Sequence, residues 1–251
     1  MKKYVVVVLI LVFMFVGSMT FKYVKLEKNK SNFKDEEEIV PIKSENIDKS
    51  NKEIKTEKYP GINKLMIVAH PDDESYWGGA HLIEDDYLVV CITCGTVKKR
   101  VTEFKTAMDL TNDEYIMLNY PDRNKMGKKD DWSSVYKNIK VDLEKIINSK
   151  HWEMIVTHNP DGEYGHIHHI KTNRMVTELA DKDVLYYFGK YFSKKNLEKI
   201  SGMKTISDKS LKRKEKDLIP IYKSQKNAEN AFKHMFKYEN FVFNKNWKVK
   251  L

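Results

Sequence analysis

From residue 64 onward, short apolar runs alternate with longer stretches in which apolar residues recur at helical spacing. The short runs predict buried strands, which lie at 64–69, 87–93, 115–118, 154–157 and 184–188. The longer stretches predict amphipathic helices, which lie at 101–110, 132–148 and 167–179, with another inside 209–238. Regular alternation of strand and helix predicts a three-layer, Rossmann-like α/β fold around a mostly parallel sheet.

The first 59 residues follow a different pattern. Two lysines precede the run 4–21, which is apolar apart from a glycine, a serine and a threonine. About 20 such residues can span a bilayer, so we expect residues 1–21 to be an uncleaved signal anchor, with a cleaved export signal as the alternative. Residues 22–59 are dominated by charged residues, Asn and Ser, and predict a disordered tether. The protein is therefore expected at the cell membrane, with its folded domain, residues 60–251, outside the cytoplasm.

Polar side chains cluster where each of the first four predicted strands ends. The clusters are 70–73, 93–95, 119–123 and 157–166. The carboxyl ends of parallel strands meet at one edge of the sheet, which is where open α/β sheets bind ligands. No G-x-G-x-x-G follows a strand, so an ordinary dinucleotide-binding fold is excluded. The sequence predicts one composite site built from loops that are far apart in the chain.

The first cluster has the chemistry of a metal site. His70 and Asp73 are three residues apart in a turn, close enough to share one ion. A third ligand must come from elsewhere, and the fourth cluster leads into His166 and His169, which are also three apart. Asp72 neighbours a ligand without needing to be one. A free carboxylate in that position can take the proton of a metal-activated water as a general base.

These residues carry a resemblance to a known family. His70-Pro-Asp-Asp-Glu74, with Gly78-Gly79 soon after, resembles the signature of the PIG-L/LmbE-like deacetylases, and Gly165-His-Ile-His-His169 resembles their second metal motif. Weaker matches are Thr93 with Gly95, Arg100-Val-Thr-Glu103-Phe104, Pro121-Asp122 and Tyr222-Lys-Ser-Gln225. The resemblance extends from residue 64 to residue 225. This zinc-dependent family removes acetyl groups from N-acetylglucosamine-type sugars.

The resemblance implies a role for each matching residue. His70, Asp73 and His169 would be the zinc ligands, Asp72 the general base and His166 the electrostatic acid. The expected substrate contacts are Arg100 and Asp122. The alternatives are that Arg100 is a surface charge at a helix start and that Asp122 caps a turn. The implied partner is an N-acetylated amino sugar or glycoconjugate. The implied cofactor is Zn²⁺, and another divalent ion remains an alternative because affinity order alone does not select zinc in the cell.

The second metal motif departs from the family pattern at one position. Many members have H-P-D-H where this chain has His166-Ile-His168-His169. The aspartate that would polarise the acid histidine is replaced by His168. Two explanations stay open: either Asp161 or Glu163 orients His166, or the pKa of this histidine differs here.

Composition narrows the choice of partner. The formal net charge is +9, and its lysines fit either attraction to an anionic surface or solvated helix faces. Aromatic residues are not interleaved with the basic runs, so no nucleic-acid partner is expected. The only two cysteines, Cys91 and Cys94, exclude a zinc site built from four cysteines of one chain. His158 ends the fourth predicted strand, and we expect it to be a hydrogen-bonded support rather than a ligand.

Two other functions compete with deacetylation. An anchored carbohydrate-binding protein could keep this fold without catalysis, but it would have no need of Asp72. A different zinc hydrolase, such as a phosphodiesterase, would bring Lys or Arg side chains to clamp a phosphate, and the motifs lack such a clamp.

Overall fold

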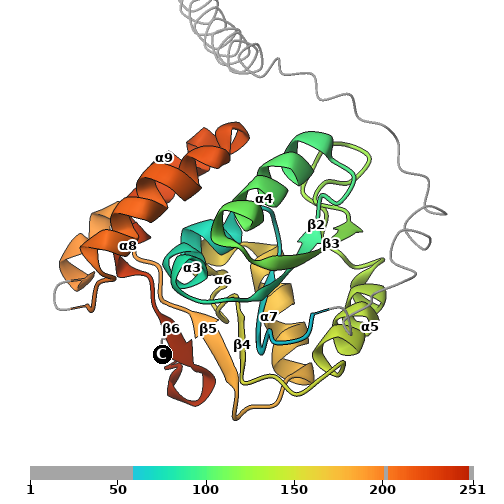
Figure 1. Ribbon diagram of the computed structural model, residues 1–251. Helices are drawn as coiled ribbons and strands as arrows, with labels where there is room; N and C mark the ends of the chain where they lie inside the picture. Colours follow the sequence, from blue (N-terminus) through green and yellow to red (C-terminus); the bar gives the residue numbers. More distant parts are fainter. Residues whose placement is uncertain (1–58, 201–202, 249–251) are drawn as a thin grey trace, which may run out of the picture. The chain divides into compact units, whose positions relative to one another are not determined.

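Five parallel strands and one antiparallel edge strand form a single sheet in the computed structural model, which describes residues 59–200 and 203–248 (Figure 1). The order across the sheet is β3-β2-β1-β4-β5-β6. The strands are β1 Lys64–Val68, β2 Leu88–Thr93, β3 Glu114–Tyr120, β4 Met154–Thr157, β5 Leu185–Phe188 and β6 Phe241–Phe243. The five predicted strands are confirmed, and β6, which pairs antiparallel with β5, was not predicted.

Helices connect successive strands. They are α3 Asp73–Glu84, α4 Lys98–Thr111, α5 Tyr136–Ile147, the short α6 Gly162–Gly165, α7 Ile167–Leu179, α8 Asp208–Arg213 and α9 Lys226–Phe232. The predicted helices at 101–110, 132–148 and 167–179 correspond to α4, α5 and α7. The helix expected inside 209–238 is instead interrupted between α8 and α9 by a π-helical turn, Lys214–Leu218, and by 3₁₀ turns at Ile219–Ile221 and Lys223–Gln225.

Two apolar clusters cover the two faces of the sheet and confirm the three-layer arrangement. On one face, Leu65 and Ile67 of β1 pack with α5 and α7 residues such as Ile139 and Met175. On the other face, Met66 and Val68 pack with α3, α4 and the C-terminal segment. Successive residues of β1 are buried in opposite layers because side chains alternate along a strand. Continuous burial of β1 and β2 on both faces explains why their sequences are uninterrupted apolar runs.

The strand order places the ends of β1 and β4 side by side. Leu65 of β1 pairs with Leu88 of β2 on one side and with Ile155 of β4 on the other. The chain therefore leaves β1 in one direction across the sheet and later returns to its opposite side. Such a reversal opens a crevice beyond the carboxyl ends of the strands. The 70–73 and 157–166 clusters both start there.

Helix α3 lies close against the sheet and the C-terminal segment. A Cβ built on Gly78 would lie 2.6 Å from the Met66 Cε atom, so the absence of a side chain permits the close approach. Lys214, in the π-helical turn, donates to the Tyr76 carbonyl (2.8 Å) and to Glu239 (2.5 Å). Glu239 in turn accepts from the backbone N–H of Ala80 (3.0 Å). This buried ion pair fastens the C-terminal segment to the middle of α3.

The predicted transmembrane helix at 1–21 and residues 22–58 of the predicted tether lie outside the described residues. Within 59–200 and 203–248, no helix combines the length and apolarity needed to cross a bilayer. Tyr59, which the sequence placed in the tether, packs against the core, and its hydroxyl donates to the Tyr115 carbonyl (3.5 Å). The folded domain therefore includes Tyr59.

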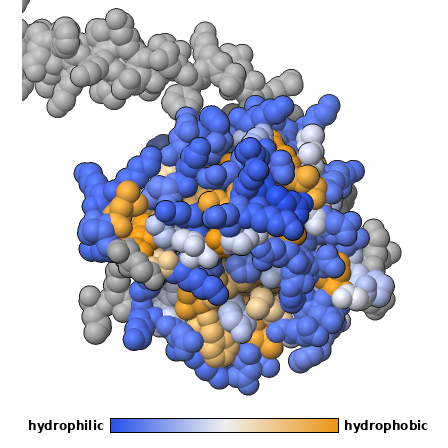
Figure 2. Space-filling view, turned by 60° about the vertical axis from the view of Figure 1, so that its left-hand side comes forward, coloured by the Kyte–Doolittle hydropathy of each residue, from blue (hydrophilic) through white to orange (hydrophobic). Residues whose placement is uncertain are grey.

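Hydrophilic residues cover most of the face seen in Figure 2, and hydrophobic residues lie between them in separate patches. Among the described residues, the exposed large hydrophobic side chains are Leu110, Met126, Val141, Tyr164 and Leu197. Tyr164 is the one that lies beside the site described next.

Candidate metal centre and active site

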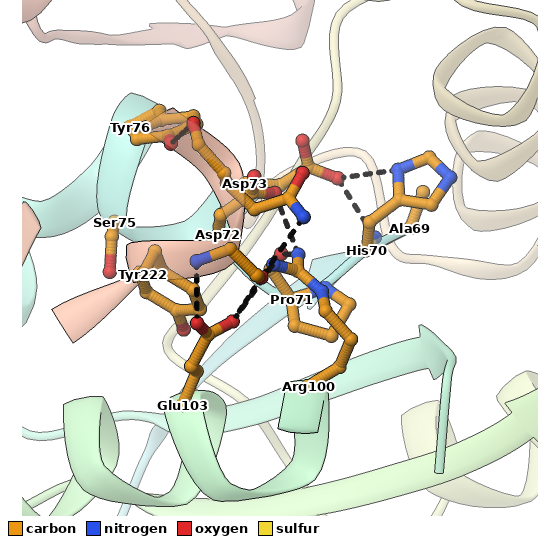
Figure 3. A network of polar contacts seen from close by, with 12 residues as sticks. Ala69, His70, Pro71, Asp72, Asp73, Ser75, Tyr76, Arg100, Glu103 and Tyr222 are labelled. Atoms are coloured by element: carbon orange, nitrogen blue, oxygen red, sulfur yellow. Dashed lines mark hydrogen bonds and ion pairs between the residues drawn. The ribbon is translucent and has the colours of Figure 1, made fainter. Parts of the chain in front are cut away.

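The loop between β1 and α3 places an imidazole beside a carboxylate. The backbone N–H of His70 donates to Asp73 Oδ2 (2.8 Å), and His70 Nδ1 lies 3.1 Å from the same oxygen (Figure 3). Asp72, the residue before α3, has φ 110°. A positive φ in a non-glycine residue costs about 1–3 kcal/mol and persists only where surrounding contacts impose it. Here the imposed turn points the side chains of Asp72 and Asp73 in different directions.

The opposite side of the site comes from α6 and the first turn of α7. Glu163, in α6 with φ 54°, places its carboxylate Oε2 2.5 Å from His169 Nδ1 and 2.9 Å from His158 Nδ1. Its other oxygen accepts from the backbone N–H of Asn159 (3.0 Å). His169 Nε2 then lies 3.2 Å from Asp73 Oδ1. One buried carboxylate thus orients two imidazoles toward the end of β1.

His169 Nε2 is a buried atom without a hydrogen-bond partner among the described residues. An ionised carboxylate can only accept a hydrogen bond, so His169 donates its Nδ1–H to Glu163. In the neutral ring the lone pair is then on Nε2, which faces Asp73. Burial raises the pKa of Asp73, but positive charge placed at His169 and His158 outweighs burial and holds that pKa well below its usual range, so the Asp73 carboxylate is stabilised by a cation on the histidine side. A lone pair facing an ionised carboxylate calls for a cation between them, so the donor set fits a metal ion.

Three overlapping sets of side chains could hold such an ion. Their ligand atoms lie within 4.8 Å of one another: His70 with His166 and His169, His70 with Asp122 and His168, and Asp73 with His158 and His169. The predicted ligands His70, Asp73 and His169 each occur in at least one of these sets, although the three together are not one of them. Asp73 contacts His70 through Oδ2 and His169 through Oδ1. Their roles as ligands remain a prediction.

His158 has the hydrogen bonds expected of a support, although it also belongs to one of the three candidate metal sets. Its Nε2 accepts from the Ala69 backbone N–H (3.0 Å), while its Nδ1 contacts Glu163 (2.9 Å). Both ring nitrogens are therefore used within the protein, although Nε2 also lies 3.4 Å from Asp73 Oδ2. The side chain is completely buried and ties the end of β4 to the end of β1.

Asp72 lies beside a guanidinium group rather than in the ligand set. Arg100 Nη2 is 3.6 Å from Asp72 Oδ1 and also donates to the Pro71 carbonyl (Figure 3). Burial raises the pKa of Asp72 well above its ordinary value, and Arg100 opposes that rise. A buried carboxyl with a raised pKa holds a proton more readily than an exposed one, which suits a general base.

Arg100 is itself held by protein groups. It donates to Glu103 (3.1 Å) and to the Ser224 hydroxyl (3.0 Å), and it stacks over the Tyr222 ring at 5.6 Å. The guanidinium is buried, so its described contacts orient Asp72. Contact with a substrate, the role implied by the resemblance, remains a prediction for Arg100.

The C-terminal Tyr222-Lys-Ser-Gln225 motif braces the wall of the site. The Tyr222 hydroxyl donates to Glu74 Oε1 (2.6 Å), and Glu74 Oε2 accepts from the Asp72 backbone N–H (3.0 Å). Ser224 donates its backbone N–H (2.8 Å) and its hydroxyl (2.6 Å) to the two oxygens of Glu103. The motif therefore supports Asp72 through two intermediates: Tyr222 acts through Glu74, and Ser224 acts through Arg100.

Comparison with known proteins adds an independent observation. Residues 65–180 match the protein family described as PIG-L: GlcNAc-PI de-N-acetylase. These residues, slightly less than half of the chain, are similar to the PIG-L family. The matched PIG-L region runs from the start of β1 to the end of α7 and contains both predicted metal motifs.

Relatives of this PIG-L region have been sequenced in a virus and in bacteria. Uncharacterized protein L374 of Acanthamoeba polyphaga mimivirus is 31% identical over 50% of this chain and 61% of its own length. The 1D-myo-inositol 2-acetamido-2-deoxy-alpha-D-glucopyranoside deacetylase of Streptomyces griseus is 27% identical over 49% of each chain. The solved A40926 pseudoaglycone deacetylase Dbv21 covers 67% of this chain and 84% of its own, with TM-score 0.49 and 13% identity. The chain thus spans about half to three fifths of the curated relatives' length.

The surroundings of His166 bear on the absence of the neighbouring aspartate. Glu163 does not orient His166, because its carboxylate contacts His158 and His169. His166 Nδ1 instead accepts from the His168 backbone N–H (3.2 Å). Burial, and then the nearby imidazoles of His70 and His169, lower the pKa of His166. Among the described residues, no hydrogen bond or ion pair joins Asp161 to His166 either. The lowered pKa agrees with the second explanation, which stays a prediction.

Asp122 lies at the solvent side of the site. Its Oδ1 is 3.6 Å from His70 Nε2 and 3.9 Å from His168 Nδ1, and its side chain is 35% exposed. That position is compatible with the predicted substrate contact, which stays a prediction.

Sequence reasoning did not identify Asp130 and Trp132, which contact His168 from the loop before α5. Neither belongs to a motif; only their place after the third polar cluster could have drawn attention to them.

Proposed function

We propose that this chain is a metal-dependent hydrolase that removes the N-acetyl group from an N-acetylglucosamine-type sugar. The observation that carries the proposal is the lone pair of the buried His169 Nε2, directed at the Asp73 carboxylate next to the separate, buried carboxyl of Asp72. The match of residues 65–180 to the PIG-L family and the names of the Streptomyces relatives support the substrate class.

We assign the ion to His70, Asp73 and His169. Two imidazoles and one carboxylate are a common set of protein ligands at catalytic zinc sites, which leave one position open. Zinc is the proposed ion, and another divalent metal is the alternative. When bound, the ion would polarise the acetyl carbonyl and make water more acidic.

The residues around the ion divide the remaining chemistry. Asp72 would take the proton of the attacking water while the water oxygen bonds to the amide carbon. The same carboxyl would then pass that proton to the amide nitrogen as the carbon–nitrogen bond breaks, leaving acetate and a free amine. Arg100 keeps the Asp72 carboxylate oriented and opposes the rise of its pKa on burial.

His166 would act as a neutral hydrogen-bond donor. Its Nδ1 accepts from the His168 backbone, so a neutral ring carries its proton on Nε2. A donor aimed at the carbonyl oxygen would stabilise the negative charge that develops there. This role needs no protonated imidazolium, in keeping with the lowered pKa of His166.

A combined metal and activity measurement tests the proposal. The purified protein, loaded with zinc, is incubated with an N-acetylated chitooligosaccharide, a peptidoglycan fragment and an N-acetylglucosaminyl-inositol, and acetate release is measured along with metal content. We expect about one ion per chain and acetate from at least one substrate. Binding of these sugars without acetate release would overturn the proposal and favour the carbohydrate-binding alternative.

The predicted location is a separate part of the proposal. We propose that residues 1–21 anchor the protein in the cell membrane with the domain outside the cytoplasm. Cell fractionation and protease treatment of intact cells test it. Recovery of the chain in the soluble cytoplasmic fraction would contradict the anchor.

A further inference from the structure

His168, which replaces the aspartate of the family motif, sits in a rigid stack. The ring is completely buried in the first turn of α7 and lies parallel to the ring of Trp132, with centroids 4.0 Å apart and an interplanar angle of 3°. Trp132 is also buried, and its indole N–H donates to the Pro121 carbonyl (2.7 Å). The position and tilt of the His168 ring are therefore fixed.

The partners of His168 define where its proton lies. Its Nε2 is 2.6 Å from the Asp130 carbonyl oxygen. A carbonyl oxygen can only accept, so the proton of the neutral ring is on Nε2 and the lone pair is on Nδ1. That Nδ1 lies 2.8 Å from His70 Nε2. For this contact to be a hydrogen bond, His70 must carry its own proton on Nε2.

The consequence reaches the proposed ion. With its proton on Nε2, a neutral His70 has its lone pair on Nδ1, 3.1 Å from Asp73 Oδ2. We infer that His168 is a positioning residue that sets the tautomer of His70, so that Nδ1 is the nitrogen that binds the metal. The inference rests on the metal site of the proposed function and is independent of the sugar.

The distances distinguish this arrangement from the competing one. The set of His70, Asp122 and His168 could hold a cation only if His70 offered Nε2 instead. Two nitrogen ligands of one tetrahedral zinc are about 3.3 Å apart, given metal–nitrogen distances of about 2.0–2.1 Å. The 2.8 Å between His70 Nε2 and His168 Nδ1 is shorter and typical of a hydrogen bond. The separations of Asp73 from His70 (3.1 Å) and from His169 (3.2 Å) are closer to the ligand spacing.

Nitrogen NMR of the zinc-loaded protein tests the inference directly. In protein labelled with ¹⁵N-histidine, the shifts of the two ring nitrogens tell which one carries the proton, and a His70→Gln variant assigns the signals. We expect His70 to be protonated on Nε2 and not on Nδ1. A His70 protonated on Nδ1 would overturn the inference, and this measurement requires no substitution of His168.

Two matched variants test the effect on metal affinity. His168→Asn keeps an acceptor near the position of Nδ1, whereas His168→Gln keeps a polar group near Nε2 for Asp130 but none for His70. We expect zinc affinity, measured by competition with a chelating dye, to fall about 10- to 100-fold in His168→Gln and to stay near wild type in His168→Asn. Equal affinities of the two variants would overturn the inference.

The outcomes separate this inference from the proposed function. A protein with the expected tautomer and variant affinities that releases no acetate would refute the deacetylase and leave the positioning role intact. A protein that releases acetate but has His70 protonated on Nδ1 would refute the positioning role alone.

Discussion

Asp72 has an unfavourable backbone conformation and lies next to the Arg100 guanidinium. It is not one of the three proposed metal ligands. Asp72→Asn keeps the size of the side chain and tolerates positive φ nearly as well, but the amide cannot accept a proton. We expect turnover to fall about 100- to 10,000-fold, with metal content unchanged. Steady-state acetate release and metal analysis on the same sample check this, and substantial residual turnover would remove Asp72 from the role of base.

Arg100 offers a test of position against substrate contact. Because its charge lowers the pKa of Asp72, Arg100→Gln should raise that pKa and move the acidic limb of the pH–rate profile to higher pH. We expect kcat to fall with little change in KM, since the described contacts of Arg100 are with protein groups.

Arg100→Lys, which retains the charge, is the control for this experiment and should shift the limb less. If KM rises in Arg100→Gln while kcat is kept, the side chain contacts the substrate, as the family resemblance implies.

Individual site residues could be predicted from the sequence where they belong to a motif, but not where their contacts depend on the backbone conformation. The proximity of His70 to Asp73 and of His166 to His169 could be predicted, because residues three apart in a turn lie close together. The sequence offered Glu163 as one residue that could orient His166, which it does not contact. Its actual partners, His158 and His169, depend on the turn at its positive φ, which a sequence of residue types does not specify.

Among the elements, the junction of α4 and β3 carries a buried acid. Asp113 Oδ1 accepts from the Tyr87 backbone N–H (2.7 Å) at the start of β2, and burial raises the Asp113 pKa to about 7. The folded protein therefore retains a proton that the unfolded chain releases. The free energy of unfolding should fall as pH rises from 3.8 to about 7 and should lose nothing further from this group above that range.

Asp113→Asn mimics the protonated side chain and should lack this part of the pH dependence. Relative to wild type, we expect the variant to become more stable as pH rises across that range. Denaturant unfolding at a series of pH values checks this. Parallel stability curves for the two proteins would mean that Asp113 ionises freely in the fold.

The parallel strands could be predicted because burial makes them short apolar runs, and three of the helices because their buried residues recur at helical spacing. Helix α3 was missed because its first turn buries Asp73, Glu74 and Ser75 against the site, so its apolar spacing is interrupted. The helix predicted inside 209–238 is divided into α8 and α9, and Pro220, which lacks an N–H, lies in one of the 3₁₀ turns between them. Strand β6 has three residues and pairs with β5 from far along the chain, a contact that no local pattern indicates.

For the whole molecule, the proposed ion would join segments from both sides of the strand-order reversal. His70 and Asp73 follow β1, whereas His169 lies in α7 after β4. A ligand that binds the folded state alone stabilises it by about 2.7 kcal/mol at 100 times its dissociation constant. We expect chelator-treated protein to melt at a lower temperature than zinc-loaded protein.

Calorimetry with and without zinc checks this, with His169→Ala as the control. That variant should have lost the metal, so zinc should not change its melting temperature. A zinc-dependent shift that survives in His169→Ala would place the ion elsewhere.

The reversal of strand order also imposes a sequence of events on synthesis. Ala69 and His158, which join the ends of β1 and β4, are 89 residues apart, and parallel pairing over such a separation is slow. A growing chain exposes His70 and Asp73 long before His169 exists, so it cannot enclose an ion early. The proposed ion could be enclosed only after α7 has packed onto the end of β1, so metal binding and completion of the fold would be coupled.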